Sequence, residues 1–226
     1  MSTSTTSSQA ATAVSRSAHN RAIAGAAVFL VAYLAVSPVA GMFATGDIPL
    51  PTDPGEQIKA FLVANPLAAI SGAILQAVSI IGFAVFARVV VPMTGNRALG
   101  VVAGISVAAM LVSSVITLVS AVFAADLSAD TLATLRLAGF YAGGVVNVTT
   151  LGFVAFATSR QLVRVGAVGR GTAILGYVVG TLSMLSVISL AVYYANLFLP
   201  LGRVGSMVWT LVAAIVLMRR TGRSAK

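Results

Sequence analysis

The sequence predicts an all-α fold, that of a polytopic membrane protein with six transmembrane helices. Of its 226 residues, 58% are hydrophobic and 8% are charged, and the mean hydropathy is +1.01. A soluble globule needs a charged surface, which this composition does not provide. The lengths of the uncharged runs and the distribution of charges between them then give the number of spans and their orientation.

The uncharged runs set the number of spans. A bilayer core about 30 Å thick is crossed by roughly 20 helical residues, so each of the first four runs predicts one helix. The turn-like Asn196–Gly202 divides the last stretch into two helices. The second of these is expected to begin near Pro200, with Arg203 directed outward to the membrane surface. The runs cover residues 22–46, 60–87, 98–125, 137–159, 171–202 and 204–218.

The charges predict that both termini are cytoplasmic. Eleven of the 14 basic residues lie in the two tails and in the second and fourth connections, whereas all five acids lie in the other connections. Cytoplasmic loops carry the excess of Lys and Arg in membrane proteins. The net charge of +9 is therefore explained by orientation. Because no basic patch with interleaved aromatic side chains exists, we expect no binding of nucleic acid.

Three parts of the chain are distinguished by composition. Residues 1–20, rich in Ser and Thr, predict a disordered cytoplasmic tail, because they cannot bury enough apolar surface to fold alone. Residues 21–220 form one transmembrane domain, and residues 221–226 are a basic cytoplasmic tail. The excess of Arg over Lys, with abundant Ala, Val and Gly, indicates a bacterial plasma membrane.

One connection predicts a short helix near residues 53–65. Asp53 is expected to be the N-cap, with Pro54 in the first turn, and Asn65 before Pro66 ends the helix. We expect an amphipathic helix that lies at the outer membrane interface and anchors this connection, with a lid over a substrate as the alternative. The apolar residues at helical spacing are Ile58, Phe61 and Leu62.

The predicted spans lack the residues that chemistry in a membrane usually needs. The sole histidine, His19, lies in the N-terminal tail, the chain has no cysteine, and no acid falls inside a span. This excludes paired-histidine haem ligation, thiolate metal sites and proton relays. An outer cation site for lipid chemistry at Asp126 and Asp130 would have too few ligands. We therefore expect a protein that is not an enzyme and uses no metal and no cofactor.

Glycines at four-residue spacing occur in the third, fourth and fifth spans. Such pairs allow helix backbones to approach closely. We expect packing inside the monomer, with dimerisation as the alternative. The pairs are Gly100 and Gly104, Gly139 and Gly143, and Gly176 and Gly180.

A hydrogen-bonding side chain lies near the middle of every span. Gln76 and Asn147 each share a helix face with small residues, so both amides are expected to point at neighbouring helices. Two interpretations stay open. The side chains either form interhelical hydrogen bonds or surround a midplane pocket, in which the two amides orient a neutral or amphiphilic ligand. The set is Tyr33, Gln76, Ser113, Ser114, Asn147, Ser183, Ser186 and Thr210.

The order of these features resembles that of uncharacterised six-span bacterial integral membrane proteins, grouped as a domain of unknown function. The resemblance covers residues 21–218. It rests on the first span, the short helix Gln57–Pro66, the glycine-bearing second span and the basic turn Arg160–Arg170. It implies the six-span topology and carries no activity.

Two functions are consistent with the sequence. The missing ionisable groups favour an accessory or scaffolding subunit of a membrane complex. Such a subunit would contact membrane lipids and either a partner membrane protein or a second copy of the chain. The alternative is a facilitator, exporter component or binder of a hydrophobic small molecule or lipid, which would use the midplane pocket.

Overall fold

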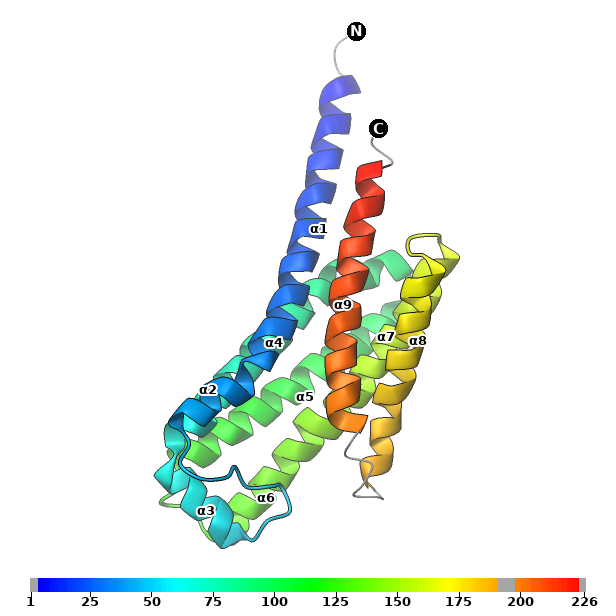
Figure 1. Cartoon of the computed structure of the whole chain (residues 1–226). Helices are drawn as coiled ribbons and strands as arrows, with labels where there is room; N and C mark the ends of the chain where they lie inside the picture. Colours follow the sequence, from blue (N-terminus) through cyan, green and yellow to red (C-terminus); the bar gives the residue numbers. More distant parts are fainter. Residues whose placement is uncertain (1–3, 191–197, 224–226) are drawn as a thin grey trace.

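The computed structural model describes residues 4–190 and 198–223, with side chains from 17 to 188 and from 198 to 219. The all-α architecture is confirmed, as are six helices long and apolar enough to cross a membrane. Figure 1 shows both ends of the chain at one end of the bundle, the termini end, and the short helix α3 (Gly55–Ala64) at the other, the α3 end. The spans are Ser17–Phe43, Pro66–Thr94, Arg97–Val122, Ala129–Arg164, Arg170–Ile188 and Phe198–Arg219.

The first span consists of α1 (Ser4–Leu34) and α2 (Val36–Phe43). They are separated at Ala35 because Pro38 has no N–H to donate to the carbonyl of Leu34. Helix α1 begins at Ser4, within the tail that was expected to be disordered. The difference has a local cause, since alanine is frequent in this segment and favours helix without tertiary contacts.

The predicted short helix is present as α3 (Gly55–Ala64), but its expected N-cap is wrong. Its N-cap is Pro54, and the carboxylate of Asp53 instead accepts from the backbone N–H of Leu50 at 2.7 Å. Its apolar face is buried against helix α6 (Ala129–Gly139) and the turn before it. The cluster there contains Ile58, Leu62, Ala124 and Leu132.

Asn65 joins three elements at the α3 end. It ends α3 and precedes α4 (Pro66–Val90), whose first residue is a proline that needs no hydrogen-bond acceptor. The Asn65 side chain is buried, and its Oδ1 accepts from the backbone N–H and the hydroxyl of Thr45 at 2.7 and 2.8 Å. The loop after α2 is thereby attached to the start of the second span.

The third and fourth spans follow the 3₁₀ turn η1 (Val91–Thr94). Helix α5 (Arg97–Val122) is capped by the Asn96 side chain. The fourth span is one continuous rod of α6 (Ala129–Gly139), the π-helical segment η2 (Phe140–Val146) and α7 (Asn147–Arg164).

The last two spans are α8 (Arg170–Leu185), continued by the 3₁₀ turn η3 (Ser186–Leu190), and α9 (Phe198–Arg223). The predicted turn at Asn196–Gly202 begins outside the described residues. From Phe198 onward the chain is helical, close to the expected start near Pro200.

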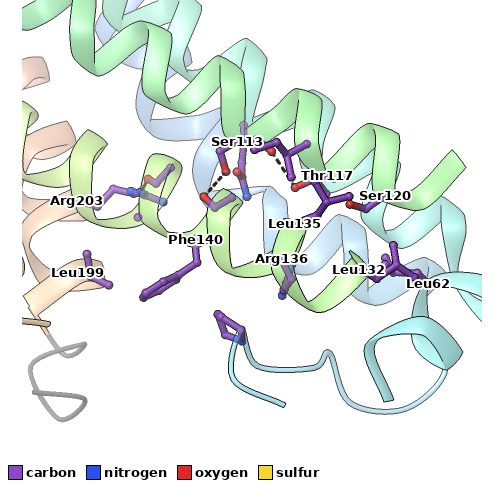
Figure 2. A pocket seen from close by; sticks show the side chains of 16 residues that line it. Leu62, Ser113, Thr117, Ser120, Leu132, Leu135, Arg136, Phe140, Leu199 and Arg203 are labelled. Atoms are coloured by element: carbon purple, nitrogen blue, oxygen red, sulfur yellow. Dashed lines mark hydrogen bonds between the residues drawn. The ribbon is translucent and has the colours of Figure 1, made fainter. Parts of the chain in front are cut away.

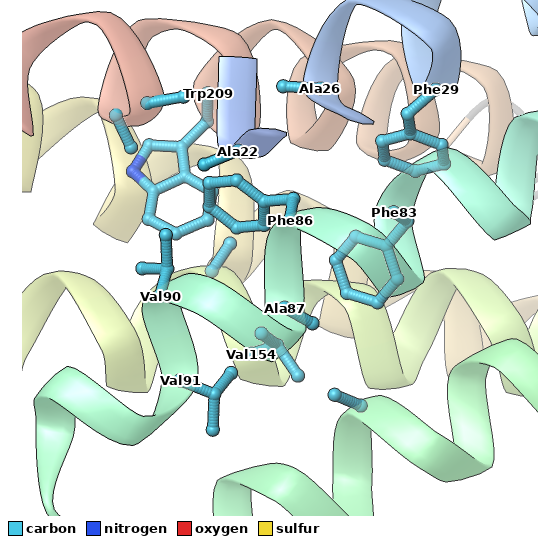
Figure 3. Close-up of a cluster of buried hydrophobic side chains, with 14 of the residues drawn as sticks. Ala22, Ala26, Phe29, Phe83, Phe86, Ala87, Val90, Val91, Val154 and Trp209 are labelled. Carbon is cyan, nitrogen blue, oxygen red and sulfur yellow. The ribbon is translucent and has the colours of Figure 1, made fainter. Parts of the chain in front are cut away.

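The spans form a closed ring in which α1, α4, α5, α7, α8 and α9 each contact the next, and α9 returns to α1. The core of the half toward the termini end is aromatic (Figure 3). Its four large rings belong to Phe29, Phe83, Phe86 and Trp209, each at most 1% exposed. These rings are closely packed, although a groove of about 590 Å³ lies in the same half between the end of α4 and the start of α5. The two cavities described next lie in the α3 half.

Candidate functional site

A cavity of about 220 Å³ opens in the α3 half, among α4, α5, α6, η2 and α9. Most of its wall is made of leucine, isoleucine, phenylalanine and glycine. A second cavity of about 160 Å³ adjoins it, because Leu62, Gln76, Thr117 and Arg136 line both. The polar side chains of the first cavity, here named the Arg203 cavity, are Gln76, Ser113, Thr117, Ser120, Arg136 and Arg203.

Arg203 lies inside the bundle, so the expectation that it reaches the membrane surface is wrong. Only 9% of the residue is exposed. Its Nη2 donates to the carbonyl oxygen of Gly143 and, over 3.3 Å, to Oδ1 of Asn147. Its Nη1 lies 3.4 Å from the hydroxyl of Tyr33, and Cζ lies 5.2 Å from the centroid of that ring. Because α9 packs between α1 and α8 and also contacts α7, this face of its first turns points inward.

Arg203 keeps unused capacity to bind. A guanidinium has five N–H donors and stays charged. The buried Nε–H of Arg203 has no acceptor among the described residues, and neither does the buried hydroxyl of Ser120 on the same cavity. All five acidic residues of the chain are described, and none of them pairs with Arg203. The cavity is therefore lined by a buried cation without a counter-ion.

The Gly143 carbonyl is offered to Arg203 by the π-helical segment η2. The wider π turn replaces the regular i to i+4 ladder, and such segments are frequent at functional sites. Helix α5 holds η2 in place, since Ser113 donates its hydroxyl to the carbonyl oxygen of Gly139 at 2.8 Å. Gly143 packs directly on Ser113, where a Cβ would collide with the serine side chain.

Asn147 is fixed by Ser106 of α5. Its Nδ2 donates to the carbonyl oxygen and the hydroxyl of Ser106 at 2.9 and 3.0 Å, and the Ser106 hydroxyl donates to the Asn147 carbonyl oxygen at 3.2 Å. These bonds leave Oδ1 free to accept from Arg203. Asn147 is fully buried and does not line the cavity. Its role in the structure is to position Arg203.

The start of α9 is held against α8 by Ser183. The Ser183 hydroxyl lies 2.9 Å from the carbonyl oxygen of Gly202 and 3.1 Å from the hydroxyl of Ser206. A Cβ on Gly202 would lie 2.7 Å from the Ser183 Cα, so only glycine permits this approach. The residue before Arg203 therefore fixes how deeply the arginine enters the bundle.

Arg136 is the second arginine of the cavity, and in Figure 2 it lies between Arg203 on one side and Leu132 on the other. It is half-buried, and its Nη2 donates to the carbonyl oxygen of Pro49 at 2.9 Å. The Asp53 carboxylate lies close enough to interact with it electrostatically. Arg136 thus connects the loop before α3 to the cavity wall.

Gln76 is the one amide of the predicted pair that lines the cavity. It is half-buried between the two cavities, and its side chain forms no hydrogen bond to any other described residue. An amide that faces a cavity without a protein partner is available to a ligand or to water.

The other predicted polar residues make local contacts. Tyr33 and Ser113 support the cavity as described above, whereas Ser114 donates to the Met110 carbonyl and Thr210 to that of Ser206. Ser186 contacts the hydroxyl of Thr149. The set therefore comprises residues of one cavity, two hydroxyls that bond within their own helices, and the interhelical contacts of Ser183 and Ser186, and it does not form one cluster.

The predicted glycine pairs also differ from one another. Gly139 and Gly143 pack on α5, Gly176 lies against Ser159 and Trp209, and Gly180 packs on α7. Gly100 and Gly104 do not pack inside the monomer as expected. Both are exposed, and a Cβ on Gly104 would meet nothing within 4 Å.

Sequence reasoning missed Arg203 as a residue of the cavity, although a signal existed, and it considered Arg136 only as part of an outer group with Asp126 and Asp130. Arg203 alone interrupts an otherwise uncharged stretch of 48 residues, 171–218. An isolated ionisable residue in such a stretch is a candidate functional residue by default. The described residues contain no group of three or more His, Asp or Glu that could hold a metal ion.

Comparisons of this chain with family models, with curated proteins and with solved structures found no match. Only the residues of the cavity itself therefore indicate its function.

Proposed function

We propose that this protein is a non-enzymatic binder or facilitator for an amphiphilic small molecule or lipid, which occupies the Arg203 cavity. The observation that carries the proposal is a cavity with mostly apolar walls that is also lined by Gln76, whose amide has no hydrogen-bond partner among the described residues, and by Arg203, whose charge has no counter-ion there. Small-molecule sites combine apolar walls with a few such polar groups. Together the two adjoining cavities are on the order of the size usual for such sites.

The placement in the cell is part of the same proposal. The six apolar spans support a multi-pass protein of a bacterial plasma membrane. The excess of Lys and Arg in the tails and in the connections at the termini end supports cytoplasmic termini. The Arg203 cavity would then lie in the outer half of the bilayer and receive its ligand from that side.

Native mass spectrometry of the full-length protein in mild detergent tests this function. We expect the wild-type protein to retain an amphiphile in stoichiometric amount and Gln76→Leu to lose it. Gln161→Leu is the matched control, because it makes the same change in a half-buried glutamine at the termini end. A wild-type protein that carries no small molecule in several detergents, or a Gln76→Leu variant that retains it fully, would contradict the proposal.

A second candidate function is that of an accessory or scaffolding subunit, and the exposed side of α5 favours it. Gly100 and Gly104 lie open there beside the exposed Val101 and Ile105. Small residues on an exposed helix face are typical of helix contacts between membrane subunits. We expect Gly104→Leu to release a partner or a second copy that co-purifies with the wild type. Recovery of the wild-type protein as a partner-free monomer in several lipids would exclude this function.

A further inference from the structure

The electrostatics of the Arg203 cavity indicate the class of ligand. The chain contains five acids, and none lies within ion-pair distance of Arg203. A buried charge is strongly unfavourable unless an opposite charge and hydrogen bonds compensate it. The carbonyl of Gly143, the amide of Asn147 and the ring of Tyr33 provide dipoles and a π face, but no negative charge. An anion in the cavity would provide the missing counter-charge.

A second cation lines the same cavity. Arg136 interacts electrostatically with Asp53 and donates to the Pro49 carbonyl. The positive charge of Arg136 is therefore partly compensated, whereas that of Arg203 is not. Arg203 lines the same cavity, and none of the acidic residues of the chain pairs with its guanidinium. Two guanidinium groups around one cavity suit a carboxylate or phosphate, which accept several charge-assisted hydrogen bonds at once.

The rest of the wall determines that the anion must carry an apolar part. Leu62, Ile116, Leu132, Leu135, Phe140 and Leu199 surround the polar groups. A free inorganic anion would leave these side chains against water, whereas an alkyl chain would bury them at about 25 cal/mol per Å² of apolar surface. The geometry therefore favours an amphiphile over a small hydrophilic ion.

We propose that the Arg203 cavity binds the carboxylate or phosphate headgroup of a single-chain amphiphile, with Arg203 as the main contact, Arg136 as the second and the alkyl chain along the leucine-rich wall. This inference rests on the proposed function, because it names the chemical class of the ligand that the cavity holds. A structural role for Arg203, in which it only holds η2 through the Gly143 carbonyl, is the alternative that the experiment must separate.

Competition binding on the full-length protein in nanodiscs of phosphatidylcholine separates these roles. Radiolabelled decanoate is the probe, and unlabelled decanoate, decyl phosphate, decanol and acetate are the competitors. We expect saturable binding that decanoate and decyl phosphate displace, whereas decanol and acetate require at least about tenfold higher concentrations. The reason is that hydrogen bonds to charged groups are worth about a factor of ten or more in affinity. Addition of phosphatidylglycerol to the nanodiscs tests whether a phospholipid headgroup is also accepted, which would show as weaker decanoate binding.

Decanoate binding by variants of Arg203 is the second test. Arg203→Gln is expected to weaken decanoate binding by at least about tenfold while leaving decanol binding unchanged, and Arg203→Lys should retain part of the affinity because it keeps the charge. Arg97→Gln is the matched control, since it removes one exposed arginine outside the cavity and should bind as the wild type does. If Arg203→Gln fails to fold, the comparison of decanoate with decanol on the wild-type protein still decides the matter.

The outcomes distinguish the two proposals from each other. If decanol competes as well as decanoate and decyl phosphate, the cavity binds amphiphiles without regard to charge, and the inference is wrong while the proposed function stands. If no probe binds saturably, both are wrong. If Arg203→Gln folds and binds decanoate as tightly as the wild type, Arg203 has only a structural role.

Discussion

The two halves of this bundle differ in how the interior between the helices is packed. Toward the termini end the rings of Phe29, Phe83, Phe86 and Trp209 follow one another with centroids 5.2, 6.4 and 6.1 Å apart. Toward the α3 end the same helices surround a cavity with two arginines. If stability alone were required of the spans, filling both halves would serve it better, because empty space in a core costs free energy. The α3 half, whose cavities are lined by polar and charged side chains, is therefore the part of the molecule to examine for binding.

Glycines explain why one half closes. A Cβ on Gly82 would lie 2.6 Å from the carbonyl oxygen of Gly25, so α1 and α4 meet backbone to backbone at this point. Gly152 and Gly180 bring α7 and α8 together in the same way, with a Cβ on either only 2.7 Å from the carbonyl oxygen of the other. In the α3 half, Gln76 of α4 and Arg203 of α9 line the cavity instead.

Truncation of the aromatic core should have the largest effect on stability. Trp209→Ala removes a side chain that is 1% exposed and should lower the free energy of unfolding by about 3–5 kcal/mol. Phe140→Ala, in the half-buried wall of the cavity, should cost clearly less. Thermal unfolding of both variants in the same mild detergent checks this. Equal losses would mean that the two halves contribute alike and would contradict the comparison.

A smaller effect on stability is expected when a methyl group is added at the contact between α1 and α4. Gly82→Ala should cost about 1–3 kcal/mol, because the new methyl group meets backbone atoms that cannot rotate away. Gly104→Ala makes the same change on the open face of α5, and should be neutral or slightly stabilising since alanine favours helix. The midpoint of unfolding of each variant is the measurement. A destabilising Gly104→Ala would show that this face is packed.

The smallest predicted change concerns the loop over the cavity. Asp53→Asn removes the carboxylate that competes for Arg136, so it should strengthen decanoate binding about two- to threefold, with stability within about 0.5 kcal/mol of the wild type. Asp47→Asn is the control, because it neutralises an exposed acid of the same loop. The competition assay in nanodiscs measures both variants. Weaker binding by Asp53→Asn would show that Arg136 does not contact the headgroup.

Hydropathy was sufficient to predict the six spans, because the bilayer fixes both the length and the composition of a crossing helix. The start of the fourth span was not predicted. Helix α6 begins at Ala129, before the uncharged run at 137, since Ser128 caps it, Asp130 in its first turn is exposed, and Arg136 in its last turn lines the cavity. Because the uncharged runs were bounded by charged residues, they could not include the part of this helix that contains Asp130 and Arg136.

The cavity itself was only half predictable. Gln76 and Ser113 were identified because polar residues in a span need a partner or a ligand. The burial of Arg203 was not, since it depends on the π segment η2, which offers the Gly143 carbonyl, and on the close contact of Gly202 with Ser183. Neither feature has a hydropathy signal, and both become visible only when the helices are placed against one another.

The most direct test of a ligand cavity in the α3 half uses the fact that the chain has no cysteine. Thr117→Cys places a single thiol on the wall shared by both cavities, and Thr210→Cys places one at a position of α9 that is 1% exposed. In purified protein, a thiol-reactive maleimide should label Thr117→Cys rapidly and Thr210→Cys slowly, and decanoate should protect Thr117→Cys where decanol does not. Equal labelling of the two thiols, or labelling of Thr117→Cys that decanoate leaves unchanged, would contradict a ligand cavity at the α3 end.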